Sequence, residues 1–361
     1  MRTLLSPRAG LIALMLAAPA PFTTPAPALA ALPPYTPVGT FQLPAGTHAY
    51  TVAPDGRLLA IVGPEILAQS ELNGSAFSRL GGVDPALVPS FGASFLEVSP
   101  DGGRLAIGDN GLAGAVHLVS AGALDPAPGA FAPTTPVAVP NNFTAHFLDS
   151  DTLLVGGSAG FGAASFVEEL TALGAPAPLT RTVITNIDGA PGGLASRNGF
   201  LFTGNGFDNG PGGSETGEVR AFPLASLALA PMDFEGAGIP VADALSAVSL
   251  GFDALGNLLV GGGDFFGSGD AGYAAVIDSD AIDAALWGAP VAPIAPDSAE
   301  LRLVPATPLD FYSIRHNPVT NELLVSAFGS DTVYRYAVPA PGSLAALALI
   351  GLAVGRRRHG A

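Results

Sequence analysis

The chain repeats one short pattern six times, and this repeat constrains its fold more than any other feature. Each unit has a β-rich stretch, a turn marked by Asp or Asn, a short apolar strand that ends in Gly or another small residue, a Gly-rich loop and a further strand. A fixed period of this kind indicates structural units that stack to bury a common core. The six turn markers, spaced by 46, 50, 47, 55 and 64 residues, are Asp55, Asp101, Asp151, Asn198, Asp253 and Asn317.

Each unit is predicted to form a β-hairpin. Apolar residues alternate before the turn at Asp101, whereas residues 105–107 form a continuous apolar run after it. Alternation predicts a strand with one solvent-exposed face, and a continuous run predicts a strand buried on both faces. The Asp-Gly pair allows the positive φ that a tight hairpin turn needs.

These units predict an all-β protein, and a β-propeller in particular, because a period of roughly 40–50 residues is typical of propeller blades. Six blades fit residues 31–337 best, and a seventh is possible if residues 125–140 or 285–308 conceal one. Residues 35–43 are expected to complete the last blade, since pairing the two ends of the body removes open sheet edges. A β-sandwich is the alternative fold.

Helices are expected to be few. The chain contains 47 Gly and 34 Pro, both of which disfavour helix interiors. Residues 279–287 are the best helical candidate, as a short decoration on a loop.

The N-terminus predicts export. Arg2 and Arg8 precede a short apolar run, and residues 28–30 (ALA) give a small-x-small cleavage pattern. This layout is typical of a secretory signal peptide, predicted here for residues 1–30, and an uncleaved anchor is the alternative.

The C-terminus, residues 338–361, has three parts in order. A Val-Pro-Ala-Pro stretch comes first, then an apolar segment at 344–355 that predicts a helix, then an arginine cluster. At about 1.5 Å per residue this helix spans only about 20 Å of a roughly 30 Å hydrocarbon core, so it is marginal as a permanent transmembrane helix. The motif and cluster residues are Val338, Pro339, Pro341, Arg356, Arg357 and Arg358.

This tail resembles the PEP-CTERM sorting signal, which exosortase systems of Gram-negative bacteria recognise. The resemblance implies a cell-surface or extracellular-matrix location, an exosortase-type sorting enzyme as partner, transient membrane insertion, and a link to extracellular polysaccharide and biofilm. The Glu of the family motif is Ala340 here, so the tail could be cleaved slowly or persist as an anchor. A plain C-terminal transmembrane helix is the alternative.

The charge excludes one class of partner. The chain has 30 acidic residues against 14 basic ones, all of them Arg, and a formal net charge of −16. Nucleic acid is not expected as a partner, because phosphate neutralisation needs a basic stripe that is absent. The chain also has no Cys, which excludes disulfides and thiolate chemistry.

The second and sixth repeats resemble YVTN and NHL propeller repeats most clearly, through SPDGGRLAIGDNGLAGAVHLVS and NPVTNELLVSAFGSDTVYRYAV. Six-bladed relatives of the NHL class include lactonases and other hydrolases with a metal in the central channel. The resemblance therefore leaves a metal-dependent hydrolase open.

Acidic residues in the Gly-rich loops are calcium candidates, because Ca²⁺ prefers carboxylate and carbonyl oxygens on flexible backbone. The alternative is that these side chains only satisfy turn geometry. No other cofactor is indicated. The candidates are Asp109, Asp208, Asp264, Asp270 and Asp331.

The histidines form no metal-binding motif in sequence. His48, His146 and His316 each lie within a few residues of a turn marker, and His117 lies apart. Equivalent positions in a propeller can converge at one mouth of the channel, where a His/Asp cluster could bind a metal or supply a general base.

No catalytic residue is assigned on this basis. The favoured hypothesis is an exported propeller that binds a polysaccharide, a protein or cations. The alternatives are a calcium-dependent hydrolase such as a lactonase and a self-associating matrix component.

Overall fold

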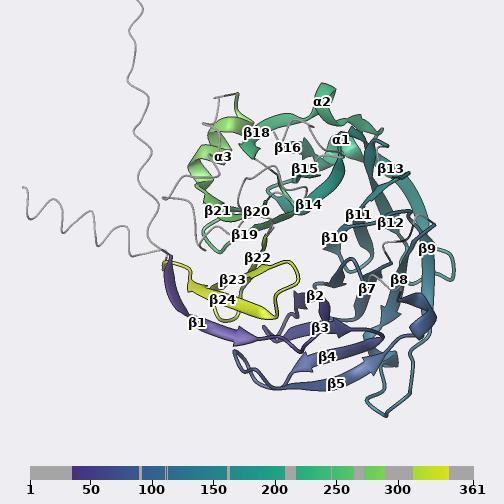
Figure 1. Cartoon of the computed structure of the whole chain (residues 1–361). Helices are drawn as coiled ribbons and strands as arrows, with labels where there is room; N and C mark the ends of the chain where they lie inside the picture. Colours follow the sequence, from purple (N-terminus) through teal and green to yellow (C-terminus); the bar gives the residue numbers. More distant parts are fainter. Residues whose placement is uncertain are drawn as a thin grey trace, which may run out of the picture. The chain divides into compact units, whose positions relative to one another are not determined.

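The computed structural model describes residues 35–88, 92–109, 111, 113–160, 163–207, 217–244, 246–263, 272–288 and 312–340. These residues form six β-sheets, and the sheets follow one another along the chain as blades 1 to 6 (Figure 1). The prediction of six repeated units is confirmed, and the described residues contain no seventh sheet.

The first three blades are built almost entirely from consecutive strands. Blade 1 contains β2 (Thr47–Val52), β3 (Leu58–Val62), β4 (Glu65–Gln69) and β5 (Phe77–Gly82). Blade 2 contains β6 (Leu96–Val98), β7 (Arg104–Gly108), β8 (Ala115–Ser120) and β9 (Thr134–Ala138). Blade 3 contains β10 (Thr144–Asp149), β11 (Thr152–Ser158), β12 (Ser165–Thr171), β13 (Leu179–Ile187) and the later strand β17 (Met232–Asp233), which pairs in parallel with β13.

The last three blades complete the ring. Blade 4 contains β14 (Ala190–Arg197), β15 (Phe200–Phe207), β16 (Gly217–Pro223) and β18 (Ile239–Ala244). Blade 5 contains β19 (Ser249–Phe252), β20 (Leu258–Gly262) and β21 (Tyr273–Ile277). Blade 6 contains β22 (Tyr312–Asn317), β23 (Glu322–Ala327), β24 (Thr332–Ala337) and the N-terminal strand β1 (Thr36–Gln42).

The first strand of each blade lies innermost. β2, β6, β10, β14, β19 and β22 contact one another in this order, and β22 contacts β2 again. The six sheets therefore close into a ring, which Figure 1 shows end-on. We call the end with the six hairpin turns after the inner strands the turn face, and the opposite end the loop face.

The second strand of each blade forms the core, as the continuous apolar runs predict. Leu58, Ile107, Leu153, Leu259 and Leu323 are all at most 1% exposed. Neighbouring blades bury both faces of these strands, because the hydrophobic clusters span pairs of adjacent sheets.

Gly residues in the second strand permit close packing between blades. A Cβ on Gly261 in β20 would lie 2.2 Å from the carbonyl oxygen of Tyr312, at the start of the next inner strand. Gly204 in β15 would place a Cβ 2.9 Å from the Ala247 side chain in the segment that leads to the next blade. Both separations are too short for a side chain to fit without displacing the neighbouring blade.

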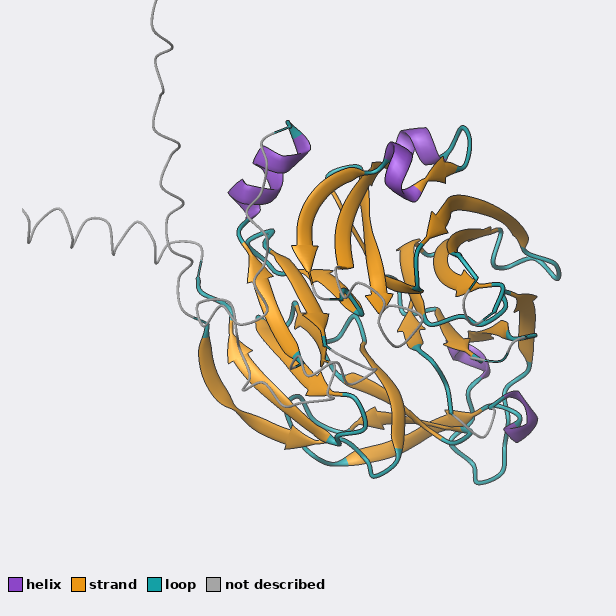
Figure 2. Ribbon diagram, turned by 45° about the horizontal axis from the view of Figure 1, so that its top comes forward, coloured by secondary structure: helices purple, strands orange, loops and turns teal. Residues whose placement is uncertain are grey.

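Helices are short and peripheral, as the composition predicts (Figure 2). The predicted helix at 279–287 is α3 (Ser279–Leu286), and the carboxylate of Asp278 caps it by accepting from the Asp280 N–H at 2.8 Å. No helix of the described residues is long and apolar enough to cross a membrane. The remaining helices are η1 (Pro85–Leu87), η2 (Ala121–Ala123), α1 (Leu224–Leu227) and α2 (Phe234–Ala237).

β1 closes the ring, which confirms the prediction for residues 35–43. It pairs antiparallel with β24, from Thr36 opposite Ala337 to Gln42 opposite Thr332. The Tyr35 hydroxyl donates to Asp253 at 2.5 Å and accepts from Asn257 at 2.8 Å, so the start of this strand is also tied to blade 5.

The propeller ends at the first residue of the predicted sorting motif. Val338 is buried, and its N–H donates to the carbonyl oxygen of Asn321 at 3.0 Å. Pro339 follows as a half-buried residue. The predicted signal peptide at 1–30 and the tail from Pro341 to the arginine cluster at 356–358 lie outside the described residues.

Candidate functional site

One polar cluster joins several blades at the centre of the ring. Strand register places Thr51, Glu97, His146 and Arg315 at the same level of β2, β6, β10 and β22, because their partners Leu59, Ala106, Leu154 and Leu324 are equivalent residues of the second strands. Each lies on an inner strand close to the turn face. Together with Ser196 of β14, these residues make up what we call the axial cluster.

Arg315 and Glu97 form an ion pair within the axial cluster. Arg315 Nη1 lies 2.7 Å from Glu97 Oε1, across the intervening strand β2. The Thr51 hydroxyl, from β2, donates to Glu97 Oε2 at 3.2 Å. The guanidinium carbon of Arg315 lies 5.9 Å from the ring centroid of Tyr50, within the range of a cation–π contact. The pair therefore links blades 6, 1 and 2.

The Glu97–Arg315 pair is only partly withdrawn from solvent. The accessible fraction is 28% for the Arg315 side chain and 16% for Glu97. Water can therefore reach part of this ion pair.

His146 extends the cluster to blades 3 and 4. Its Nε2 lies 2.8 Å from the Ser196 hydroxyl, with donor and acceptor roles set by the tautomer. Burial, and next the positive charge of Arg315, lower the pKa of His146 to about 4. His146 is consequently neutral at pH 7.

A serine–histidine contact suggests acyl transfer, but Arg315 opposes that chemistry. A general-base histidine becomes an imidazolium as it takes the serine proton, and catalytic sites stabilise this ion with a carboxylate. Here the charge that acts on His146 is positive. The arrangement suits binding through neutral hydrogen bonds better than proton transfer.

The His146 environment predicts acid sensitivity. Its folded-state pKa lies below the unfolded value of 6.5, so the unfolded chain binds a proton first as the pH falls. The stabilisation from neutral His146 is thus complete above pH 6.5 and is lost as the pH falls to about 4, by up to about 3 kcal/mol. Thermal unfolding of the parent protein and His146→Gln between pH 7 and 4 should show a smaller loss in the variant. Equal losses would contradict this description of the site.

The other histidines do not join the cluster. His48 is exposed at the start of β2, and His316 Nε2 lies 3.2 Å from Asn321 in its own turn. His117 in β8 is buried, and its Nε2 lies 3.6 Å from Asp109 Oδ2. Burial lowers the pKa of His117 although Asp109 opposes this shift. Of the three turn histidines, the fold brings only His146 to the axial cluster.

The calcium candidates are only partly described. Asp109 follows β7 in blade 2, and its carboxylate accepts from the Gly111 N–H at 2.8 Å, which is a turn-forming contact. Asp331 precedes β24 in blade 6, where its carbonyl oxygen accepts from Leu43 at 2.7 Å. Asp208, Asp264 and Asp270 lie outside the described residues. Among the residues that are described, no three His, Asp or Glu side chains come together to hold a metal.

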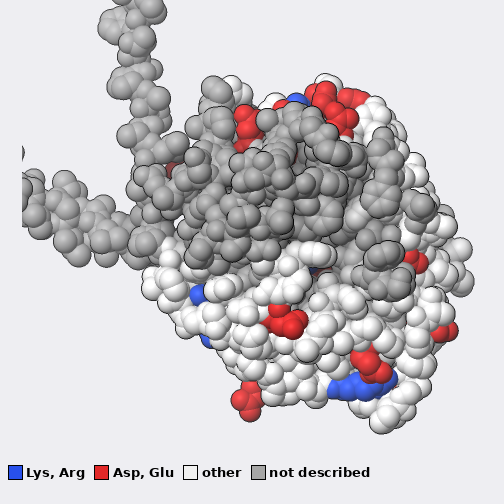
Figure 3. All heavy atoms as spheres, viewed as in Figure 1, with Lys and Arg blue, Asp and Glu red and all other residues white. Residues whose placement is uncertain are grey.

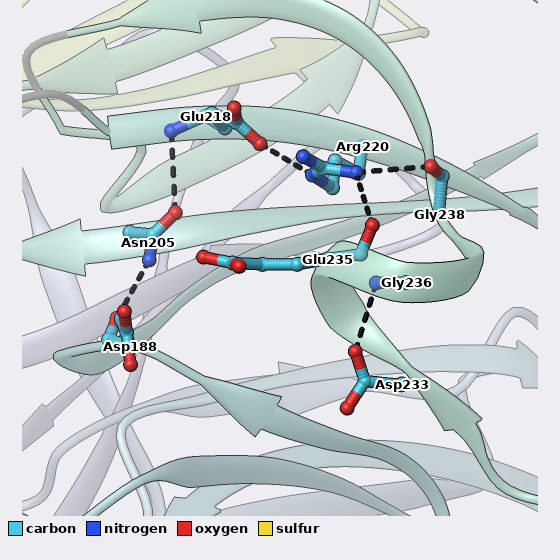
Figure 4. A network of polar contacts seen from close by, with 8 residues as sticks. All are labelled: Asp188, Asn205, Glu218, Arg220, Asp233, Glu235, Gly236 and Gly238. Carbon is cyan, nitrogen blue, oxygen red and sulfur yellow. Dashed lines mark hydrogen bonds and ion pairs between the residues drawn. The ribbon is translucent and has the colours of Figure 1, made fainter.

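Several other charged groups join strands and loops of the scaffold. In Figure 4, Arg220 binds Glu218 and reaches two carbonyl oxygens beside α2, while Asp233 caps that helix through the Gly236 N–H at 2.8 Å. Asn205 joins β15 to β16 through the Glu218 N–H at 3.2 Å. Figure 3 shows the described charged side chains scattered over one face rather than gathered in a stripe. These contacts serve the scaffold.

A concave region lies between blades 2 and 3 on the outer side of the turn face. This groove of about 550 Å³ is lined by Asp101, Arg104, Thr134 and Leu173 among others. Arg104 is already occupied there by the carbonyl oxygen of Ser150 and by Asp151, 3.5 Å away. The groove shares no residue with the axial cluster.

Comparison with known proteins gives a likeness of fold. No family model matches the chain, and no curated protein matches its sequence. A gluconolactonase from Xanthomonas campestris, described as important in glucose secondary metabolic pathways, superimposes with a TM-score of 0.51 at 15% identity, over 82% of this chain and 87% of that chain. The likeness is one of fold alone.

A weaker likeness points to no function. A chain of the Mitotic Checkpoint Complex matches with a TM-score of 0.48 at 13% identity, over 92% of this chain and 100% of that chain. At such identities the residues of a site cannot be transferred between propellers, because this fold hosts unrelated functions.

Proposed function

We propose that this protein is an exported, surface-associated binding module, which holds its ligand at the axial cluster. The supporting observation is the position of the two ends of the propeller. Thr36 pairs with Ala337, and Val338 is bonded to Asn321 in the turn of blade 6. Both ends of the body therefore leave from the turn face, side by side, and the loop face carries neither.

Sequence signals at the two ends suit this role. Residues 1–30 would direct export, and residues 338–361 would be read by an exosortase-type enzyme. Only residues 339–343 separate Val338 from the apolar segment, a reach of roughly 20 Å in extended chain. While the tail is inserted in a membrane, the turn face would lie near that membrane and the loop face would point outward, so the ligand would enter the ring from the loop face to reach the axial cluster.

The proposed partners follow from this location. A protein held at the surface or in the matrix of a Gram-negative bacterium meets extracellular polysaccharide and other surface proteins. We propose polysaccharide, within a biofilm, as the main class of partner. A role as a self-associating matrix component would use the same location without a ligand in the axial cluster.

Binding is favoured over catalysis by the composition of the axial cluster. Its carboxylate is neutralised by Arg315, and its histidine is held neutral beside the same cation. A calcium-dependent hydrolase such as a lactonase is the second candidate, to which the fold likeness to a gluconolactonase lends some support. Calorimetric titration with Ca²⁺, followed by a lactone-hydrolysis assay, separates the two, because the binding module needs neither metal nor turnover.

The tail provides a test of the location. Replacement of Arg356, Arg357 and Arg358 by Ser is expected to shift most of the protein from the cell surface to another fraction, because the sorting signal would lose its basic end. Fractionation with immunoblotting measures this shift, with Arg57→Ser, which alters an exposed arginine of blade 1, as control. An unchanged distribution of the triple variant would contradict the sorting role.

A further inference from the structure

Arg315 uses its guanidinium differently from most arginines of the propeller. Each of the eight described arginines lies within 4.0 Å of a carboxylate. In five of them Nε itself lies against the carboxylate, namely Arg57, Arg79, Arg181, Arg220 and Arg335. Arg315 instead reaches its partner Glu97 through Nη1.

Arg335, which lies in the same blade as Arg315, provides the clearest comparison of guanidinium contacts. Arg335 in β24 binds Glu322 through both Nε, at 3.0 Å, and Nη2, at 2.6 Å. Nε and Nη2 form the side edge of a guanidinium, which matches the two oxygens of a carboxylate. In Arg335 a carboxylate of the protein fills this edge.

In Arg315 the same edge carries no protein acceptor among the described residues. Its Nε is buried without a hydrogen-bond partner, whereas Nη1 is engaged by Glu97. A buried charged donor without an acceptor is costly. The edge is therefore suited to an acceptor from outside the chain. The side chain as a whole is 28% accessible although Nε is buried, so such an acceptor has to displace the atoms that cover Nε.

The side edge of Arg315 and the neighbouring polar side chains indicate which functional groups a ligand should carry. A planar carboxylate satisfies Nε–H and Nη2–H together, which a neutral hydroxyl cannot do. His146 and Ser196 supply neutral groups that can donate to or accept from hydroxyls. A ligand that combines one carboxylate with hydroxyl groups, such as a uronic acid, matches both features.

We propose that the Nε/Nη2 edge of Arg315 binds the carboxylate of a sugar acid at the axial cluster. This inference rests on the proposed binding function and names the class of ligand for it. The net charge of −16 does not prevent such binding, because charges beyond about 8 Å are screened at physiological salt and Glu97 is already paired.

The test is calorimetric titration of the purified full chain with D-glucuronate, with D-glucose as the neutral counterpart that lacks the carboxylate. Arg315→Lys keeps the positive charge beside Glu97 but removes the side edge. Arg335→Lys makes the same change at the arginine whose edge is filled by Glu322, and serves as the matched control. Melting temperatures of both variants confirm folding.

We expect glucuronate to bind with a Kd of about 1 mM or tighter and to shift the His146 ring signals in NMR spectra. We expect Arg315→Lys to weaken binding about tenfold or more, and Arg335→Lys to leave it unchanged. Equal binding of glucose, equal loss in both variants, or no binding of glucuronate at about 10 mM would overturn the proposal. Failure of the export and surface location would be seen in cell fractions and would leave these titrations unaffected.

Discussion

Removal of residues 35–43 is expected to lower the melting temperature of the protein by roughly 10–20 °C. These residues supply the outermost strand of blade 6, where Phe41 and Leu43 are 4% and 6% exposed. Their burial, the strand hydrogen bonds and the contacts of Tyr35 with blade 5 together contribute about 5–10 kcal/mol. Without them β24 becomes an open edge, which also favours aggregation.

Point variants distinguish a buried residue of β1 from an exposed one. Phe41→Ala is expected to cost about 3 kcal/mol, whereas Val38→Ala on the same strand, 44% exposed, should change stability by less than about 0.5 kcal/mol. Differential scanning calorimetry measures both. A neutral deletion of 35–43, or equal effects of the two point variants, would show that β1 does not close the ring.

Glu97→Ala is expected to destabilise the protein by about 3 kcal/mol, because it leaves the Arg315 charge in the centre of the ring without its partner. Glu97 binds Arg315 at 2.7 Å and also accepts from Thr51. Asp55→Ala, which removes the exposed partner of Arg57 on the turn face, should cost less than about 1 kcal/mol.

A double variant tests the reason for this loss. Glu97→Met with Arg315→Met removes both charges and fills similar volume, so it should recover most of the stability that either single change loses. Denaturant unfolding of the four proteins gives the coupling energy. Additive losses would mean that the two side chains act independently and that the axial cluster is not a unit.

The repeat predicts the fold because each hairpin carries its own local signals. The turn markers, the alternating strand before each turn and the continuous apolar run after it lie within about 15 residues. Such local patterns predict individual hairpins without knowledge of distant contacts. The closing role of β1 was also predictable, since a propeller with an unpaired last blade would leave two open edges.

The axial cluster was not predictable in the same way. Glu97 and Arg315 belong to the second and sixth repeats, and nothing in the sequence near either residue indicates the other. Only alignment of the repeats by strand register places Thr51, Glu97, His146 and Arg315 at one level. This register comes from the strand pairing in the structure, whereas aspartates beside Gly are visible in the sequence as candidate ligands.

Asp109 illustrates why the sequence does not distinguish calcium ligands from turn-forming aspartates in the Gly-rich loops. Its carboxylate binds the backbone two residues later, as turn aspartates commonly do. A calcium ligand and a turn residue look alike in sequence, because both are Asx residues beside Gly. Whether the loops that contain Asp208, Asp264 and Asp270 bind calcium stays a prediction, and the calcium titration tests it.

Labelling of intact cells with a bulky, membrane-impermeant maleimide tests whether the propeller is displayed at the cell surface with its turn face toward the membrane. The chain has no Cys, so single cysteines can be introduced without background. Ala45→Cys lies on the loop face between β1 and β2, and Ala254→Cys lies on the turn face in blade 5; both alanines are exposed. The purified protein provides the reference for equal accessibility. A surface module held by its tail predicts strong labelling at position 45 and several-fold weaker labelling at position 254 in cells. Failure of both positions to react, or equal labelling of the two, would contradict the account.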